Sequence, residues 1–264
     1  MLLQRALAGS LAATAIALVA RRAGSLSISG AIAATAVGTA AVAAGWHWGA
    51  LLVLYFVCST LLTRAGAARK AARTASVVAK GGARDAVQVL ANGGLFAGAA
   101  LLSTFLPAAM GTPLALAALG ALAAATADTW ATEIGVAADG APRSLLTLRR
   151  VPPGTSGGVS IAGSLAMIVG ALFIAAVAHQ LGLGSEILAV AAGGTAGAIA
   201  DTLLGGTLQA RRWCANCKRS TERMIHDCGA PTVHAGGLPW LDNDAVNFAA
   251  TLVGALVAPL LAST

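Results

Sequence analysis

Eight long apolar segments, separated by shorter polar stretches, make up most of the chain. Each has about 18 or more predominantly apolar residues, enough for a helix to cross the hydrocarbon core of a bilayer. The pattern therefore predicts an all-α fold, a polytopic membrane bundle of about eight transmembrane helices in a single domain over residues 1–264. The expected helices cover about residues 2–20, 26–45, 47–63, 85–106, 112–135, 157–179, 185–208 and 243–262.

The polar connections place their positive charge on one side of the membrane. Of the 17 Lys and Arg residues, 16 lie in the "RRAGS" turn and in three long connections, 64–84, 136–156 and 209–242. The positive-inside rule predicts that these loops are cytoplasmic and that both termini lie outside, in what we expect to be a bacterial plasma membrane. The first segment is expected to remain as a helix, because Arg21 and Arg22 stand where a signal-peptide cleavage site would need small residues.

Composition supports the membrane class and settles the meaning of the charge. The chain is 57% hydrophobic and only 10% charged, with a mean hydropathy of +0.79. Its formal net charge of +7 would also suit a nucleic-acid-binding protein. Because the basic residues follow the predicted topology, no nucleic-acid partner is expected.

Two Ala-Asp-Thr sequences place carboxylates inside apolar segments. Asp128 and Glu133 occur in "AATADTWATEIG", and Asp201 occurs in "GAIADTLLGG". Both aspartates lie about two turns, roughly 10 Å, from the cytoplasmic ends of helices that run in the same direction, so they could share one level. Asp128 and Glu133 are about 140° apart around a helix, so they could hold one group only if the helix end unwinds or the ligand is large, as a metal–polyphosphate complex is. The alternative is that such an Asp only forms a hydrogen bond to a neighbouring helix.

Three expected helices start at the cytoplasmic side with polar residues. In "KGGARDAVQVLANGG", four polar residues recur at every fourth position, which predicts a polar stripe on one helical face; they are Lys80, Arg84, Gln88 and Asn92. In "LDNDAVN", Asp242 is a candidate helix cap, while Asn243 and Asn247 lie one turn apart.

The loop "VPPGTSGGVS" precedes another of these helices. Its glycines permit tight turns, and the free N–H groups of a helix N-terminus favour an anion, so the loop is a candidate phosphate cradle, although it could be only a turn. The cradle residues are Gly154, Thr155, Ser156, Gly157 and Gly158. Arg143, taken alone, suits a topological anchor. The carboxylates, the amides and the helix N-termini that can bind anions all lie toward the cytoplasmic side. Together they predict a site for Mg²⁺ and phosphates that opens to the cytosol.

The last loop, 209–242, contains a second group of potential ligands in "WCANCKRSTERMIHDCGAPTVH". Cys214 and Cys217 have the spacing of a zinc knuckle, and His226 with Cys228 would complete a tetrahedral set, with His234 as the competitor of His226. Disulfides are not expected in a cytoplasmic loop. We therefore expect one structural Zn²⁺ that shapes this loop, with free thiols as the alternative.

From about residue 60 to the C-terminus, the motifs "GGARDAVQVLANGG", "ADTWATEIG", "VPPGTSGGVS", "ADTLLGGTLQ" and "LDNDAVNF" resemble, in order, those of the phytyl phosphate kinase family of integral membrane proteins. The resemblance implies transfer of the γ-phosphate of CTP or another nucleoside triphosphate to a prenyl monophosphate such as phytyl or geranylgeranyl phosphate. A more distant similarity is to CTP-dependent polyprenol kinases.

Phosphoryl transfer needs metal and cationic groups more than a strong base, and a phosphate acceptor already ionises near pH 6. The expected roles are Mg²⁺ binding for Asp128, Glu133 and Asp201, and phosphate binding for Lys80, Arg84, Gln88, Asn92, Arg143, residues 154–158, Asn243 and Asn247. Two alternatives stay open: a lipid nucleotidyltransferase with the same metal site, and an ion-coupled transporter that uses the intramembrane carboxylates as ion sites.

Overall fold

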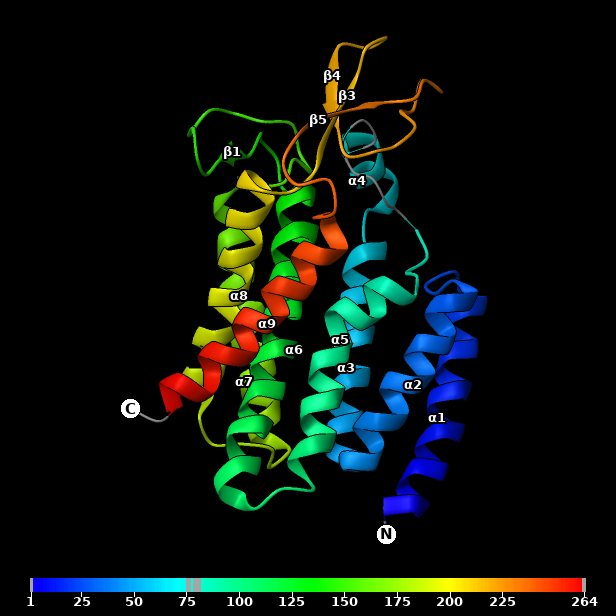
Figure 1. The fold of residues 1–264 in the computed structure, drawn as a ribbon, viewed down its shortest axis with the longest axis vertical. Helices are drawn as coiled ribbons and strands as arrows, with labels where there is room; N and C mark the ends of the chain where they lie inside the picture. Colours follow the sequence, from blue (N-terminus) through cyan, green and yellow to red (C-terminus); the bar gives the residue numbers. More distant parts are fainter. Residues whose placement is uncertain (1, 75–76, 78–81, 263–264) are drawn as a thin grey trace.

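A computed structural model of the chain describes residues 2–74, 77 and 82–262, which form nine helices and five short strands (Figure 1). The helices are α1 (Leu2–Arg22), α2 (Ile28–Ala44), α3 (Trp46–Arg64), α4 (Ala67–Thr74), α5 (Ala86–Ser103), α6 (Ala108–Ala137), α7 (Ile161–Gln180), α8 (Ile187–Thr207) and α9 (Asn243–Ala262).

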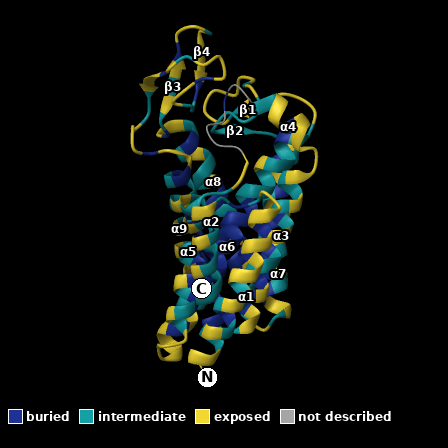
Figure 2. Ribbon diagram, turned by 90° about the vertical axis from the view of Figure 1, so that its right-hand side faces the viewer, coloured by how far each residue is buried: buried dark blue, intermediate teal, exposed yellow. Residues whose placement is uncertain are grey.

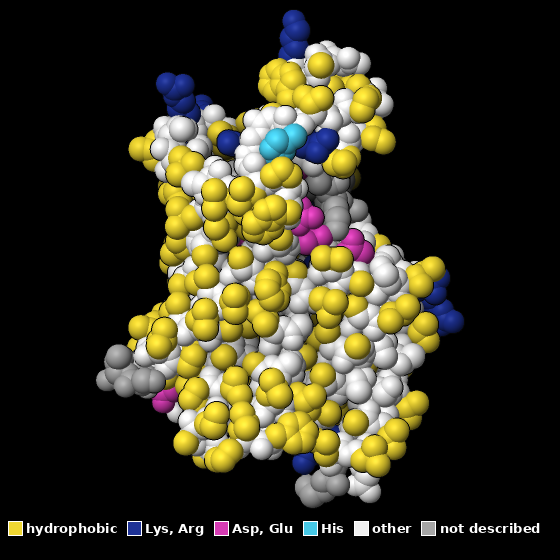
Figure 3. All heavy atoms as spheres, in the orientation of Figure 1, with side chains coloured by type: hydrophobic (Ala, Val, Ile, Leu, Met, Phe, Trp, Pro, Cys, Tyr) yellow, Lys and Arg dark blue, Asp and Glu magenta, His cyan; other side chains and the backbone are white. Residues whose placement is uncertain are grey.

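Most of these helices have the length and composition of membrane spans. Among the described residues, seven helices are long and apolar enough to cross a membrane, and α2 is a shorter apolar helix of 17 residues. Large apolar side chains also cover much of the outer surface of the bundle, as Ile161 and Leu188 do with exposed fractions of 83% and 79% (Figure 3). The predicted helical membrane bundle is confirmed, and the short helix α4 is an addition to it.

The core of the bundle is α6, which packs against α5, α7, α8 and α9. Every residue of α6 from Ala118 to Ala127 is buried, and most of them are alanine. Small side chains let helix backbones approach closely. This close packing stabilises helix association in a membrane, where the hydrophobic effect contributes little because lipid tails are as apolar as the side chains. Figure 2 shows this buried stretch of α6 at the centre of the bundle.

The polar connections gather at one end of the bundle, opposite the N-terminus (Figure 1). Strands β1 (Arg143–Ser144) and β2 (Gly158–Val159) form an antiparallel pair between α6 and α7. Strands β3 (Arg211–Cys214), β4 (Arg219–Thr221) and β5 (Val233–Gly236) form an antiparallel sheet in the order β4-β3-β5. This sheet belongs to residues 209–242, which we call the Cys/His lobe. The sequence pattern predicted no strands, because each is too short to show alternation.

Candidate functional site

Asp128 on α6 and Asp201 on α8 lie side by side, with their carboxyl groups within hydrogen-bonding distance of each other. Glycines on α8 bring the two helices together. A Cβ at Gly197 would lie only 2.5 Å from the Cβ of Ala124 and 2.6 Å from the carbonyl oxygen of Ala250. Asp201 follows Gly197 by one turn and Asp128 follows Ala124 by one turn, so this close contact carries the two carboxyl groups to the same point. We call Asp128 and Asp201 the acid pair.

The acid pair has the properties of a cation site. Two adjacent carboxylates repel each other unless a proton or a cation lies between them. Within the described part of the chain, Asp201 Oδ2 is fully buried and has no hydrogen-bonding partner. A buried oxygen without a partner is costly, and a bound Mg²⁺, which prefers oxygen ligands, would remove that cost.

The glycine-rich loop 154–158 docks on α8 close to the acid pair. A Cβ at Gly157 would lie 2.4 Å from the Cα of Gly206 and 3.3 Å from the carbonyl oxygen of Thr202, so no other residue fits here without a shift. Gly157 also has a φ of +77°, which favours glycine. The structure therefore brings the predicted cradle to the helix that carries Asp201. It places Thr155 with its hydroxyl donating to the carbonyl of Pro152, at 2.7 Å, and leaves Ser156 facing the Cys/His lobe.

Glu222 of the Cys/His lobe reaches this region, although the sequence pattern did not predict it. Ser156 Oγ donates a hydrogen bond of 2.5 Å to Glu222 Oε1, and the charge of Glu222 acts on Asp201. Burial raises the pKa of Glu222, and the hydrogen bond from Ser156 lowers it. A glutamate in a basic, cysteine-containing loop is ordinarily a solvated surface residue, so the sequence carried little signal for this placement.

Glu133 lies in a different cluster from the acid pair. Its carboxylate accepts a hydrogen bond of 2.7 Å from Thr63 on α3 and pairs at 2.5 Å with the ammonium group of Lys70 on α4. Lys70 is only 7% exposed, and the sequence pattern missed it because it lies in a basic run that the topology alone explains. The carboxylates of Asp128, Glu133 and Asp201 are not among the described groups whose ligand atoms all lie within 4.8 Å of one another.

Arg84 lies next to the Glu133 cluster. It donates to Thr60 at 3.3 Å and to Thr63 at 3.5 Å, and its guanidinium carbon is 5.8 Å from the centroid of the Phe56 ring. Arg84 and Asp128 are both close enough to Tyr55 of α3 for their charges to act on its hydroxyl group.

The prediction of one helical stripe through Arg84, Gln88 and Asn92 is wrong. Helix α5 begins at Ala86, after Asp85 caps it, so Arg84 precedes the helix and Lys80 lies outside the described residues. Gln88 Oε1 accepts a hydrogen bond from the Asp85 backbone and closes a capping box. Asn92 donates to the carbonyl of Gln88 at 2.9 Å. These amides bond within their own helix, and the sequence "DAVQ" carried the signature of the capping box.

The remaining predicted residues lie at the same polar end. Arg143, in β1, is exposed and donates to the carbonyl of Leu148 in its own loop. Asp242 caps α9, as predicted, by accepting a hydrogen bond of 3.0 Å from the backbone of Ala245. Asn243 is exposed in the first turn of α9, and Asn247 follows it half-buried one turn later. Figure 3 shows acidic side chains gathered where this polar end meets the membrane-spanning body.

The predicted zinc ligands come together within the Cys/His lobe. The ligand atoms of Cys214, Cys217, His226 and Cys228 all lie within 4.8 Å of one another. The sulfurs of Cys214 and Cys228 are 3.7 Å apart, close to the separation of about 3.8 Å that a tetrahedral ion with Zn–S bonds of about 2.3 Å requires. His226 is buried and places Nδ1 at 3.3 Å from Cys228 Sγ, whereas the competitor His234 lies in β5 and is exposed.

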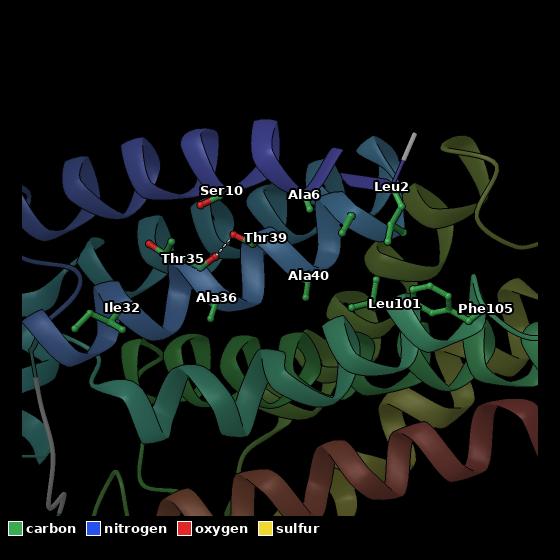
Figure 4. Close-up of a pocket in the computed structure, with 11 residues that line it drawn as sticks. Leu2, Ala6, Ser10, Ile32, Thr35, Ala36, Thr39, Ala40, Leu101 and Phe105 are labelled. Atoms are coloured by element: carbon green, nitrogen blue, oxygen red, sulfur yellow. Dashed lines mark hydrogen bonds between the residues drawn. The ribbon is translucent and has the colours of Figure 1, made fainter. Parts of the chain in front are cut away.

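An apolar groove of about 580 Å³ runs between α1, α2 and α5 (Figure 4). Its polar lining residues include Thr35 and Thr39, which donate to carbonyls of their own helix at 3.0 and 2.7 Å. None of the predicted site residues that the structure describes lines it. The groove is therefore separate from the acid pair.

Comparison with known proteins gives a family and three relatives. The model of a family described as "Integral membrane protein DUF92" matches residues 11–255. Protein PGR of Arabidopsis thaliana is 33% identical over 256 residues, which cover 87% of this chain and 86% of that protein. Uncharacterized membrane proteins of Methanocaldococcus jannaschii and of Synechocystis are 30% and 29% identical, covering 83% and 82% of this chain and 78% and 74% of their own lengths. No solved structure matches the chain.

Proposed function

Since the chain belongs to the integral membrane protein DUF92 family, we propose that it is a membrane-embedded kinase built around the acid pair. It would transfer the γ-phosphate of a nucleoside triphosphate, with CTP as the expected donor, to a prenyl monophosphate and so form the diphosphate. The observation that carries this proposal is the contact of Asp128 with Asp201, from two membrane helices, beside a glycine-rich loop.

The acid pair suits Mg²⁺ because this ion prefers oxygen ligands, and the buried Asp201 Oδ2, which has no hydrogen-bonding partner among the described residues, could coordinate it. Asp128 and Asp201 would hold the ion, which would neutralise charge on the donor phosphates. Glu133 is held by Lys70 and Thr63 in its own cluster, so its expected role as a ligand would require its carboxylate to move toward the acid pair.

Phosphate binding would fall to the groups that surround the acid pair. Arg84, whose charge acts on Tyr55 as that of Asp128 does, has a planar group that can grip two phosphate oxygens. In the loop 154–158, which has two glycines at positive φ, Thr155 and Gly158 donate their N–H groups to nearby carbonyls of the loop, so an anion would bind its other N–H groups. The prenyl tail would stay in the bilayer, where burial of each CH₂ stabilises binding by about 0.8 kcal/mol.

We also propose that the Cys/His lobe binds one structural Zn²⁺ through Cys214, Cys217, His226 and Cys228. Their separations fit a tetrahedral ion. Lys218 and Gly229 follow the two ligand pairs with positive φ values of +52° and +82°, so the backbone turns back after each pair. With four protein ligands, the ion would have no open position, which suits a structural role.

The test is to incubate the purified protein with Mg²⁺, each nucleoside triphosphate and a panel of prenyl alcohols and monophosphates, and to identify the products by mass. We expect a prenyl diphosphate, formed by the wild type and by the control Asp139→Asn but not by Asp128→Asn or Asp201→Asn. Asp139 is a suitable control because it lies just after α6 with its side chain 93% exposed. Release of pyrophosphate would identify a nucleotidyltransferase instead, and substrate flux into sealed vesicles without nucleotide consumption would identify a transporter.

A further inference from the structure

Glu222 is held in place where the Cys/His lobe meets the bundle. Its backbone N–H donates to the carbonyl of Val77 at 3.0 Å, and the neighbouring Thr221 is buried. Its carboxylate accepts the hydrogen bond of 2.5 Å from Ser156. Glu222, which directly follows β4, is therefore fixed by its backbone to the segment before α5 and by its side chain to the glycine-rich loop, both of which lie far from it in sequence.

This placement directs a third acidic group toward the acid pair. A Cβ at Gly205 would lie 3.2 Å from the Cβ of Ser156, so the partner of Glu222 rests on α8 one turn after Asp201. The charge of Glu222 acts on Asp201, which has a buried oxygen without a partner in the described residues. Burial of a carboxylate beside other carboxylates destabilises a fold unless a proton or a cation compensates, and a cation bound among the three groups would explain why the fold holds Glu222 here.

We propose that Glu222 is the third acidic group of the metal site and that the Cys/His lobe serves to deliver it. The inference rests on the proposed function, since it adds Glu222 to the metal site of that reaction. Mg²⁺ usually keeps several bound waters, so a carboxylate can hold it through water from beyond direct ligand distance. Glu222 thus acts on the ion from the lobe, while Asp128 and Asp201 act on it from the membrane helices.

The experiment measures Mn²⁺ binding to the purified full-length protein in detergent, without nucleotide, by electron paramagnetic resonance. Groups in the outer shell of a metal commonly change its affinity by about tenfold to a hundredfold when they are replaced. We expect Glu222→Gln to weaken Mn²⁺ binding by at least about tenfold and Asp201→Asn to weaken it at least as much. The exposed Asp139→Asn should leave it unchanged.

Loss of folding is controlled by the choice of glutamine. The amide oxygen that Glu222→Gln introduces can still accept the hydrogen bond from Ser156, and the neutral amide removes the cost of burying a charge. Burial raises the pKa of Glu222 in the folded protein above its ordinary value. Protonated Glu222 therefore stabilises the fold at a pH below the ordinary pKa, and this contribution is lost as the pH rises through the raised pKa. At neutral pH and with EDTA present, Glu222→Gln should therefore unfold at the same temperature as the wild type or higher.

Two results would overturn the inference. One is Mn²⁺ binding by Glu222→Gln that equals wild-type binding while Asp201→Asn binds weakly; the kinase proposal would then stand unchanged. The other is a wild-type protein that binds no Mn²⁺ through Asp128 and Asp201, because no metal site would remain for Glu222 to join. If Glu222→Gln weakens Mn²⁺ binding but the wild type forms no prenyl diphosphate, the assignment of Glu222 holds and the proposed reaction fails.

Discussion

The contact between α6 and α8 leads to a prediction that tests how the acid pair is built. A methyl group added by Gly197→Ala would lie 2.5 Å from the Cβ of Ala124. Unstrained carbon atoms stay about 3.5–4.0 Å apart, so the helices must separate by about 1 Å or more at this level. Since both aspartates follow this contact by one turn, the separation passes directly to their carboxyl groups.

The expected effects are on both stability and activity. Overpacking of this kind costs about 1–3 kcal/mol, and a displacement of about 1 Å in a catalytic group can slow a reaction about a hundredfold. We therefore expect Gly197→Ala to lower kcat/KM for prenyl phosphate phosphorylation by about a hundredfold and to lower the unfolding temperature in detergent. Mn²⁺ affinity should fall as well, which gives a measurement that does not depend on the reaction.

A matched control lies on α5, where a methyl group added at Gly98 would meet no atom within 4 Å. Gly98→Ala should keep full activity and leave stability unchanged or higher by up to about 1 kcal/mol, because Ala favours helix more than Gly does. Adding Ala124→Gly to Gly197→Ala should restore only part of the loss, because the carbonyl of Ala250 still stands 2.6 Å away. If Gly197→Ala retains activity and Mn²⁺ affinity within about threefold of the wild type, the reasoning is refuted.

Three further predictions concern the clusters around the acid pair. Elemental analysis should find about one zinc per chain, and Cys214→Ser should remove it; a metal-free protein with full activity would contradict this. Lys70→Met should lower the free energy of unfolding by about 3–5 kcal/mol, because Glu133 would stay buried without its partner, and adding Glu133→Gln should recover much of the loss; additive losses in chemical denaturation would count against the pairing. Arg84→Ala should lower kcat/KM by at least about tenfold, Arg84→Lys should recover part of this, and Arg21→Ala should change it less than about threefold; equal small effects would make Arg84 only an anchor.

The sequence predicted the parts of the fold that depend on length, apolarity and depth. The helices that carry Asp128 and Asp201 were expected within a few residues of where they lie, and their equal depth follows from counting turns from the helix ends. The close packing of α6 against α8 could also be anticipated from their alanines and glycines, since small residues are what let membrane helices approach.

The parts that the sequence could not predict depend on contacts between distant segments. Ser156 and Glu222 are 66 residues apart, and Lys70 and Glu133 are 63 residues apart, so no local spacing relates them. In the sequence, Lys70 is one of several basic residues in a polar connection, and Glu222 lies in a polar loop where a solvated surface charge is the ordinary expectation. By contrast, the start of α5, which was expected at about residue 85, is confirmed, and only the fourfold spacing of polar residues wrongly placed Arg84 on the face of this helix.

The connection of the Cys/His lobe to the bundle leads to one last prediction. The lobe follows α8 directly and leads into α9, and its base is closed by hydrogen bonds of 2.8 Å between the backbones of Ala210 and Leu241 and of Leu238 and Leu208. The base of the lobe is thus fixed to the helix that carries Asp201, whereas the position of Glu222 depends on the fold of the lobe above it. Cys214→Ser should therefore weaken Mn²⁺ binding about as much as Glu222→Gln does, although Cys214 does not belong to the metal site formed by the acid pair and Glu222.

The double variant Cys214→Ser with Glu222→Gln tests whether the Cys/His lobe affects metal binding only by positioning Glu222. If the ion in the lobe acts only by positioning Glu222, the two substitutions remove the same interaction, and their combined effect equals that of either one alone. If the lobe supports the acid pair in another way, the losses add. Additive weakening of Mn²⁺ binding, with the bundle still folded, would therefore separate the lobe from Glu222, because a carboxylate that has already been replaced cannot be displaced a second time.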